Sequence, residues 1–312
     1  MPSRVPQAFH RVTTLRFHLS FVVCLLPAAA AAVWDKGVTA LFVLGFSVLA
    51  AWAADELLRR LRRTDEPRDW GAPLWGLLLA LLLPSNVPLY LPIVGAAAAV
   101  LGVKGLLGGG VPWVNPVLVA WAFLQAGWPP AFAAKAAAAA PPSAFDVRWT
   151  DWLNSNVFSW INVQLPGGYL DLFAGLGRGP DALLVESGSL WLLAATVVLL
   201  ARGYIPWEVP AGLFAAFCVP FVVTGGNVLQ EVFSGSFLLC LFFLAPDPSA
   251  RPLTRVGLFV FGAGAGLAAF LVRTWGLAAD GVGYAVLLMN LLVPWFDQRF
   301  RRKTLNDFRT AL

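Results

Sequence analysis

Two small hydroxylated residues flank a glycine at Ser234-Gly235-Ser236, inside an apolar stretch that also contains Glu231. Small side chains let a flat ligand approach the backbone closely, and each hydroxyl group can donate or accept a hydrogen bond. The same residue types are typical of close helix packing in membranes. The tripeptide is therefore a candidate binding site, with helix packing as the alternative interpretation.

A second candidate is Asn115-Pro116, which follows a run of glycines that includes Gly109. Proline favours the first turn of a helix, so this pair predicts a helix N-terminus near the glycines. The N–H groups at such a terminus attract an anion or the electron-rich edge of a ligand. The alternative interpretation is that proline and glycine only mark helix ends.

Three charged residues lie inside or beside apolar runs. Glu186 is several residues into one run, Glu231 is near the start of another, and Lys104 is near the end of a third. Ionisable groups are costly in lipid and often have a function there. The alternative interpretation places both glutamates at wetted span ends and makes Lys104 an anchor at the membrane surface.

Signatures of soluble enzymes do not occur in this sequence. It has no phosphate loop, no zinc-binding helix motif, and no serine or cysteine nucleophile with a histidine partner. The cysteines Cys24, Cys218 and Cys240 lack the spacing of a disulfide framework or a metal cluster.

The elements that position these residues are membrane helices. Hydrophobic residues make up 59% of the 312 positions and charged residues 12%, whereas a soluble domain carries about 25% charge. We therefore expect an all-α polytopic membrane protein. The net charge of +5 does not indicate nucleic-acid binding, because the basic residues gather at span ends and tails.

About ten apolar runs approach the 17–25 residues that cross a bilayer, and counts of about eight to eleven stay open because the third, fifth and tenth runs are short. With ten spans and a cytoplasmic N-terminus, most of the 22 basic residues fall on the cytoplasmic side, as the positive-inside rule requires. The sequence thus predicts that both termini are cytoplasmic. The expected spans are Phe17–Trp34, Gly37–Ala54, Ala72–Pro84, Val87–Val103, Val111–Ala126, Ala182–Ala201, Ile205–Thr224, Val228–Ala245, Val256–Val272 and Val282–Trp295.

The spans fall into two halves. Residues 1–128 hold the N-terminal tail and five spans, residues 129–181 form an outer hydrophilic segment, and residues 182–312 hold five more spans and a tail. An odd number of spans per half requires any repeat to be inverted across the membrane. The run LLLALLLP at Leu77–Pro84 has a counterpart in LLCLFFLAP at Leu238–Pro246. We therefore expect two inverted five-helix repeats whose interrupted helices meet around a shared pocket.

Two long stretches carry a family resemblance. Gly76–Leu124 contains a short helix ending in proline, Lys104-Gly105 before further glycines, and Asn115-Pro116 at the start of the fifth span. Ser234–Arg299 contains SGS, FFLAPDP, FGAGAG and GVGYAVLLMNLLVP in that order. These stretches resemble the RnfD/NqrB family, which comprises the membrane protein RnfD of the Rnf electron-transport complex and the related NqrB of the sodium-pumping NADH:quinone reductase.

The resemblance implies a urea-transporter-like fold in a bacterial cytoplasmic membrane, beside other membrane subunits of an Rnf-like complex. Such complexes pass electrons through flavins, coupled to ion movement. Their subunits of this type usually carry an FMN joined through its phosphate to the threonine of an outer Ser-Gly-Ala-Thr motif. That motif does not occur here, and Thr150 is the only threonine of the outer segment. Its neighbour Asp151 would repel a phosphate.

We therefore expect FMN or riboflavin bound without a covalent link, with Ser234, Gly235, Ser236, Asn115 and Gly109 as the cofactor-binding residues. In this hypothesis the chain positions a flavin for electron transfer within an ion-translocating complex and is not a catalyst alone. Two alternatives stay open. One is a channel or transporter of the same fold without a redox cofactor, and the other is a cofactor-free scaffold subunit.

Overall fold

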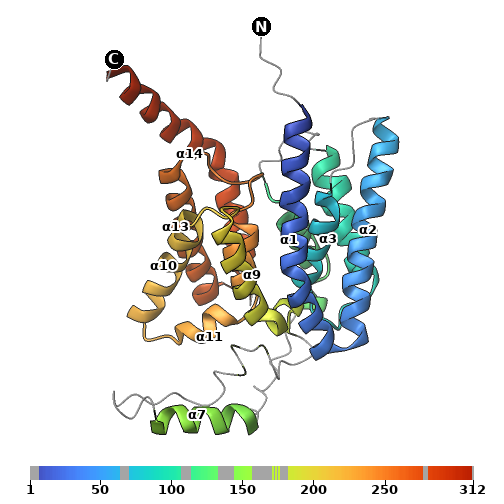
Figure 1. Ribbon diagram of the computed structural model, residues 1–312, viewed down its shortest axis with the longest axis vertical. Helices are drawn as coiled ribbons and strands as arrows, with labels where there is room; N and C mark the ends of the chain where they lie inside the picture. Colours follow the sequence, from blue (N-terminus) through green and yellow to red (C-terminus); the bar gives the residue numbers. More distant parts are fainter. Residues whose placement is uncertain are drawn as a thin grey trace.

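The computed structural model describes residues 7–63, 70–106, 114–132, 144–156, 171, 173, 175, 182–276 and 280–310. The regular elements of these residues are all helices, and the isolated bridge between Pro84 and Leu183 belongs to no strand. Figure 1 shows most of the helices running along the long axis of the molecule. The prediction of an all-α protein is confirmed for the described part of the chain.

The helices before residue 160 are α1 (Gln7–Lys36), α2 (Val38–Arg62), α3 (Gly71–Leu81), α4 (Tyr90–Ala97) continued by the π-helix η1 (Ala98–Lys104), α5 (Pro116–Gly127), α6 (Pro129–Phe132) and α7 (Ala144–Asn156). The later ones are the 3₁₀-helix η3 (Leu184–Gly188), α9 (Ser189–Ala201), α10 (Glu208–Val223), α11 (Val228–Phe233), α12 (Phe237–Leu239) continued by the π-helix η4 (Cys240–Leu244), α13 (Arg255–Trp275) and α14 (Val282–Thr310).

Four helices are long and apolar enough to cross a membrane: Arg16–Lys36, Val38–Arg62, Leu184–Ala201 and Arg255–Trp275. Shorter apolar helices are Gly71–Leu81, Tyr90–Lys104, Pro116–Gly127 and Glu208–Val223. Large apolar side chains such as Leu49, Val222 and Leu267 are exposed on the outward faces of α2, α10 and α13, as expected of helices that face lipid. The chain is a multi-pass membrane protein.

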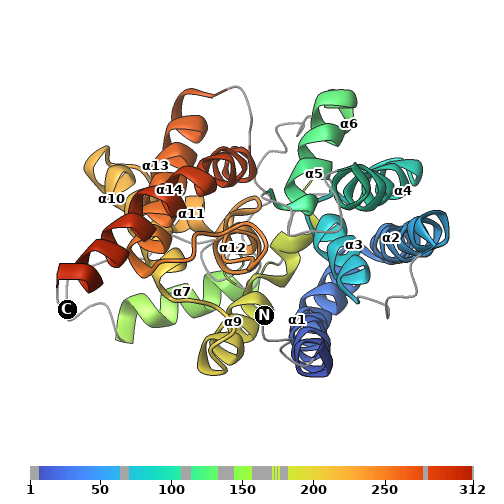
Figure 2. The same cartoon turned by 90° about the horizontal axis from the view of Figure 1, so that it is seen from above.

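Figure 1 places the beginning of α1 and the end of α14 at the same end of the molecule, and α7 at the opposite end. We call these the termini end and the loop end. Seen from above, α1 to α6 form one group, α10, α13 and α14 form another, α12 lies between them, and α9 lies beside α1 (Figure 2). The short helix α12–η4 is therefore central in the molecule.

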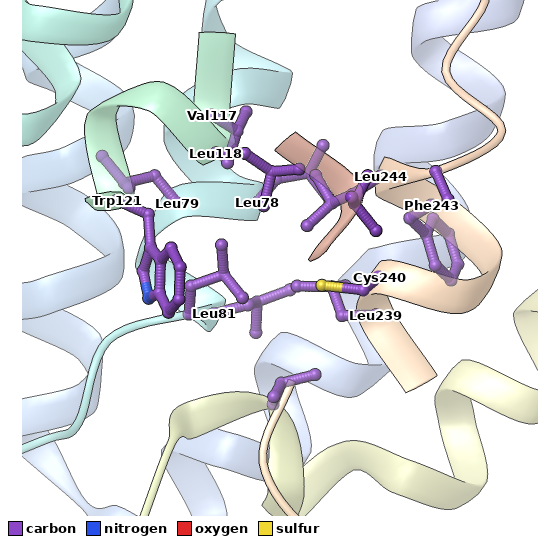
Figure 3. Packing of buried hydrophobic residues seen from close by; sticks show 14 of the residues in the cluster. Leu78, Leu79, Leu81, Val117, Leu118, Trp121, Leu239, Cys240, Phe243 and Leu244 are labelled. Carbon is purple, nitrogen blue, oxygen red and sulfur yellow. The ribbon is translucent and has the colours of Figure 1, made fainter. Parts of the chain in front are cut away.

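Leucine side chains fill the junction between the two groups. Figure 3 shows side chains of α3 and α5, including Leu81 and Leu118, facing side chains of α12–η4, including Leu239 and Leu244. These four leucines have no exposed surface. The junction is therefore a packed apolar core, whereas the sequence had suggested a pocket where the interrupted helices meet.

Glycines bring α10 and α13 into backbone contact. A Cβ atom on Gly212 would lie 2.6 Å from the carbonyl oxygen of Phe259, and one on Gly266 would lie even closer to that of Leu213. Real Cβ atoms do not approach a carbonyl oxygen so closely, so any larger residue would push the two helices apart. The small residues that the sequence shows in α13 thus serve helix packing.

The expected continuous span Val228–Ala245 is wrong. The chain forms α11, leaves the helical conformation at Ser234–Ser236, and resumes as α12–η4. Gly235 has φ +65°, a left-handed conformation that cannot continue a right-handed helix. The hydrophobic pattern of the stretch gave no sign of this break, because both parts are apolar.

Candidate functional site

The break between α11 and α12 leaves backbone groups of two helix ends without intrahelical partners. Ser234 and Gly235 are half-buried and Ser236 is fully buried. Charged side chains from other elements supply the partners. The Ser234–Ser236 turn is therefore the place in the second half where backbone, charge and small residues meet.

Carboxylates bind the N–H groups of the turn. Glu186, in η3, accepts a hydrogen bond from the Gly235 N–H at 2.8 Å. Asp280, just before α14, accepts one from the Ser236 N–H at 3.0 Å through Oδ2. A carboxylate at a helix N-terminus is favoured by the helix dipole. The N-terminus of α12 is thus occupied by acidic side chains of the chain itself.

Arg273, at the end of α13, binds the carbonyl groups of the turn. Its guanidinium donates to the Ser234 carbonyl at 2.9 Å and also to the Glu231 carbonyl. It forms an ion pair with the Glu231 carboxylate at 2.9 Å and lies 3.6 Å from Asp280 Oδ1. It also lies 5.4 Å from the centre of the Phe217 ring, within the range of a cation–π contact. We call Glu186, Glu231, Arg273 and Asp280 the loop-end cluster.

The loop-end cluster is buried and retains unused hydrogen-bonding capacity. The side chains of Arg273 and Asp280 are only 5% and 11% exposed. Arg273 Nε and Asp280 Oδ1 have no hydrogen-bond partner among the described residues. A buried polar atom without a partner costs about 1–3 kcal/mol. Both atoms are shielded from solvent, so the cluster contains one donor and one acceptor whose hydrogen-bonding capacity is unused inside the fold.

The two serines of the turn differ in what they offer. The Ser236 hydroxyl lies 3.4 Å from the sulfur of Cys240 and is fully buried. The Ser234 hydroxyl is half-buried, and no described residue binds it. Of the predicted triplet, Ser234 and the bare backbone of Gly235 are therefore the parts that a ligand can reach.

Asn115 holds the opposite end of α12–η4. Its side-chain nitrogen donates to the Leu244 carbonyl at 3.2 Å and to Asp247 Oδ2 at 3.1 Å. Its side-chain oxygen caps α5 by accepting from the N–H groups of Val117, at 2.9 Å, and Leu118, at 3.4 Å. The helix N-terminus predicted at Asn115-Pro116 is present, and its N–H groups bind a side chain of the same helix.

The predicted binding residues therefore do not form one cluster. Ser236 and Asn115 lie at opposite ends of Phe237–Leu244, which is about 12 Å long at the usual rise of 1.5 Å per residue. Gly109 lies outside the described residues. The structure does show that four of the five residues frame the same short helix.

Arg273 and Asp280 were not singled out from the sequence. Arg273 ends a long apolar run and Asp280 precedes Gly281, so each looks like an ordinary charged residue at a span end. Their role follows only from the turn at Gly235, which the sequence pattern did not reveal. The position of Glu186 inside an apolar run did point to this region.

A simpler ion pair lies at the termini end. Lys104, at the end of η1, binds Asp55 of α2 at 2.8 Å and lies 5.8 Å from the centre of the Trp75 ring. Arg62 donates to the Lys104 carbonyl at 3.2 Å, so it caps the end of the same helix. We call Asp55 and Lys104 the termini-end pair. Lys104 is thus ion-paired within the chain and is more than a membrane-surface anchor.

The likeness to known proteins extends over nearly the whole chain. Residues 2–306 match the NQR2, RnfD, RnfE family. The chain belongs to this family. The match covers both the loop-end cluster and the termini-end pair, as well as the apolar junction between them.

Curated members of the NQR2, RnfD, RnfE family resemble this chain along most of its length. The D subunit of the Na⁺-translocating ferredoxin:NAD⁺ oxidoreductase complex of Acetobacterium woodii is 29% identical over 95% of this chain and 92% of its own. The D subunit of the ion-translocating oxidoreductase complex of Halorhodospira halophila is 31% identical over 88% and 87%. The D subunit of the proton-translocating ferredoxin:NAD⁺ oxidoreductase complex of Clostridium ljungdahlii is 27% identical over 89% and 88%.

Thr150, the only threonine of the outer segment, has its hydroxyl engaged within its own helix. It lies in α7 and is buried. Its hydroxyl donates to the Asp146 carbonyl one turn earlier and lies 3.4 Å from Asp146 Oδ1. Threonine commonly turns its hydroxyl back to the preceding helical turn in this way. The hydroxyl is therefore engaged within α7.

Proposed function

We propose that this chain is the D subunit of an Rnf-type ion-translocating ferredoxin:NAD⁺ oxidoreductase complex. The family match over residues 2–306 carries this proposal. Relatives that are D subunits of such complexes align with at least 88% of this chain and 87% of their own. The agreement thus extends over nearly the whole chain.

The proposed partners are the other membrane subunits of such a complex. Affinity purification of the tagged chain from its native membranes in a mild detergent, followed by mass spectrometry, tests this. We expect the chain to retain subunits with iron–sulfur and NAD-binding sequences. If it purifies alone from membranes that contain those subunits, the assignment is wrong.

For the architecture we propose ten spans in two inverted five-helix repeats, with the termini end in the cytoplasm of a bacterial cell. In support, Lys104 and Arg273 each end the fourth apolar helix of their half and lie at opposite ends of the molecule. Arg59, Arg60 and Arg62 gather in the last turn of α2 at the termini end, in line with the positive-inside rule. Cysteines introduced by Arg63→Cys and Trp275→Cys should react with an impermeant thiol reagent from opposite sides of the membrane.

We further propose that the chain positions a flavin ring beside the Ser234–Ser236 turn. The supporting features are the half-buried Ser234, whose hydroxyl no described residue binds, and the partly exposed Gly235 beside it. A flavin supplies one- and two-electron transfer when it is bound. The residues of this chain would bind the polar edge of the ring and fix its place in the complex.

An absorption spectrum of the purified chain, together with the mass of the denatured polypeptide, tests the flavin proposal. We expect flavin absorbance without added mass, and we expect Ser234→Ala to retain less flavin than the parent. Ser249→Ala, which removes a hydroxyl at the termini end, is the matched control. Absence of flavin absorbance from the freshly isolated complex would contradict the proposal and leave the subunit assignment intact.

A channel of the same fold is the second candidate, and the junction between the helix groups speaks against it. Leu81, Leu118, Leu239 and Leu244 are fully buried there. An ion that crossed between the groups would lose its hydration in contact with hydrocarbon, at a cost of several kcal/mol or more. The packing therefore favours a subunit that carries a redox group over one that conducts ions between its halves.

A further inference from the structure

We infer that an anionic phospholipid binds at the termini end of α13, with its headgroup phosphate at Arg255 and its acyl chains along the outward face of the helix. The residues that form this place are Trp207, Leu253, Arg255, Val256 and Arg299, and we call them the α13 rim. The inference concerns a surface that plays no part in the proposed flavin site and does not depend on that site.

The outward face of α13 carries an apolar stripe. Its exposed large side chains are Val256, Phe259, Val260, Leu267 and Leu271. Side chains three, four or seven positions apart lie on one face of a helix, so these five run parallel to the helix axis. A phospholipid of the leaflet at the termini end whose acyl chains lie on this stripe places its headgroup at Arg255, where the stripe begins.

Arg255 is available to bind a headgroup. Its side chain is 89% exposed, and its Nε lies 3.8 Å from Glu208 Oε1, which is longer than a hydrogen bond. A guanidinium binds a phosphate through two parallel hydrogen bonds. Arg255 can therefore hold a phosphate without breaking a hydrogen bond to another described residue.

The helix α14 brings a second arginine to the α13 rim. The Leu253 N–H donates to Asp297 Oδ1 at 2.9 Å, and a Cβ atom on Gly257 would lie 3.6 Å from the Phe300 ring. The turn of α14 that contains Arg299 thus packs against the start of α13. Arg299 is exposed, and no described residue binds its side chain.

Positive charge dominates the surface of the α13 rim. The side chain of Glu208 is only 12% exposed, and Asp297 is partly buried and bound to the Leu253 N–H. In the sequence, three further basic residues follow Arg299 at positions 301–303. Clusters of lysine and arginine beside a membrane span attract anionic headgroups. The rim therefore favours an anionic phospholipid over a zwitterionic one.

Large apolar side chains place the α13 rim at the depth of the headgroups. Trp207 is 65% exposed and Leu253 is 74% exposed. Trp207 directly precedes Glu208, whose carboxylate approaches Arg255, so the indole belongs to the same edge of the molecule. Tryptophan is enriched where hydrocarbon meets the headgroups. The combination of exposed arginine and exposed tryptophan therefore fits a lipid better than an aqueous ligand.

The arginines at the end of α2 differ from those of the α13 rim, although they lie at the same end of the molecule. Arg60 binds Glu56 at 3.1 Å, and Arg62 donates to the Lys104 carbonyl at 3.2 Å. Their guanidinium groups are thus engaged by the chain. Arg60 is therefore a matched control for Arg255, since its side chain is also 77% exposed.

Native mass spectrometry of the full-length chain tests the inference. The chain is depleted of lipid in detergent and titrated separately with phosphatidylglycerol and with phosphatidylcholine of the same acyl chains. Each arginine near an anionic headgroup contributes about fivefold in affinity, so we expect the first phosphatidylglycerol to bind at least tenfold more tightly. This preference should shrink as ionic strength rises. Equal affinity for the two lipids would overturn the inference.

Two variants locate the binding. Arg255→Gln should lower the preference about fivefold, and Arg60→Gln should leave it as in the parent. Because both side chains are largely exposed, the unfolding temperatures of both variants without added lipid should match that of the parent, which verifies the fold. An unchanged preference in Arg255→Gln, or an equal loss in Arg60→Gln, would show that no site exists at the α13 rim.

Two further measurements identify the occupant. Inorganic phosphate in large molar excess should not displace phosphatidylglycerol, because it has no acyl chains to lie on the stripe; displacement would assign the site to free phosphate. With p-benzoylphenylalanine in place of Leu253, irradiation of native membranes should attach a phospholipid to the chain. Attachment to another protein instead would mean that a partner subunit covers the α13 rim, and the inference would be wrong.

Discussion

The termini-end pair and the loop-end cluster are both built around a cation at a helix end, but they contain different numbers of carboxylates. In each, a cation at the end of an apolar helix binds a carboxylate at 2.8–2.9 Å and lies over an aromatic ring. Lys104 meets one carboxylate, and the helix it ends is intact. Arg273 meets two, and a third carboxylate binds the turn beside it. The additional charges occur where the backbone is broken, because the free N–H and carbonyl groups of the turn need hydrogen-bond partners.

The largest effect should come from Arg273→Met. This change leaves the carboxylates of Glu231 and Asp280 without a cation and the carbonyl groups of the turn without a donor. Breaking a buried ion pair by removing one partner costs about 3–5 kcal/mol. We expect the unfolding temperature in detergent, followed by tryptophan fluorescence, to fall by many degrees. Arg273→Lys should recover part of the loss, and an unchanged unfolding temperature in the Met variant would contradict the role assigned to Arg273.

Lys104→Met should have a smaller effect. It strands the single carboxylate of Asp55, and the lysine side chain is 22% exposed, so we expect a loss of about 2 kcal/mol. The double variant Asp55→Asn with Lys104→Met removes both charges and should recover most of it. If the double variant is as unstable as Lys104→Met alone, the charges of Asp55 and Lys104 do not stabilise each other. If Lys104→Met costs as much as Arg273→Met, the comparison between the two regions fails.

Gly235→Ala should destabilise the turn by about 1–2 kcal/mol, the cost of a left-handed residue with a side chain. The new Cβ would also lie 3.0 Å from Arg273 Nη2 and 3.2 Å from Asp280 Oδ1. Gly203→Ala is the matched control, because Gly203 has φ +70° and no atom within 4 Å of its Cβ position. Greater loss of stability in the Gly235 variant, measured by thermal unfolding, isolates the contact with the loop-end cluster. Equal losses would mean that the cluster does not hold the turn tightly.

The smallest effect concerns the pH dependence at the other end of α12–η4. Burial raises the pKa of the Asp247 carboxyl, and hydrogen bonds from the Ser249 N–H and hydroxyl oppose this shift. The folded state therefore holds this proton more tightly than the unfolded state. Its contribution to stability falls as pH rises from the unfolded pKa, about 3.9, through the raised folded pKa, and is constant above that.

Asp247→Asn should remove this pH dependence. The measurement is the unfolding temperature of the parent minus that of the variant across mildly acidic pH, and we expect this difference to fall as pH rises. The variant also loses one acceptor for the Asn115 and Ser249 donors, so it is less stable overall and only the slope is informative. A difference that does not change with pH would contradict the burial of this carboxyl.

Several features of the fold follow from the sequence alone. The expected spans Phe17–Trp34 and Gly37–Ala54 lie within the longer helices α1 (Gln7–Lys36) and, from Val38 on, α2 (Val38–Arg62), and the break between the two helices agrees to within two residues, because long apolar runs with a glycine between them leave few alternatives. The cap at Asn115-Pro116 was also predicted, since asparagine before proline is a strong local signal. Local chemistry and hydrophobicity were sufficient in these places.

The candidate site was predicted only in part, because it depends on contacts between distant residues. Ser236 meets Asp280, which is 44 positions away, and Gly235 meets Glu186, which is 49 positions away. A hydrophobicity pattern does not show which charged side chain forms hydrogen bonds with the backbone groups of which turn. The same pattern predicts α11 and α12–η4 as one span. The turn at Gly235 changes the backbone conformation but not the hydrophobicity of the stretch, so the pattern cannot indicate it. The charged residues were visible, but the turn that gathers them was not.

The glycine contacts between α10 and α13 have a mechanical consequence. Where two helix backbones are in contact, no deformable side chains lie between them, so α10 and α13 should move as one rigid unit. This unit, which we call the α10–α13 strut, is about 30 Å long at 1.5 Å per residue. Arg255 and Glu208 form an ion pair at one end of this strut, and Arg273 and Phe217 approach each other further along it. A partner that pushes on the Arg255 end would therefore displace the guanidinium under the turn by a similar amount.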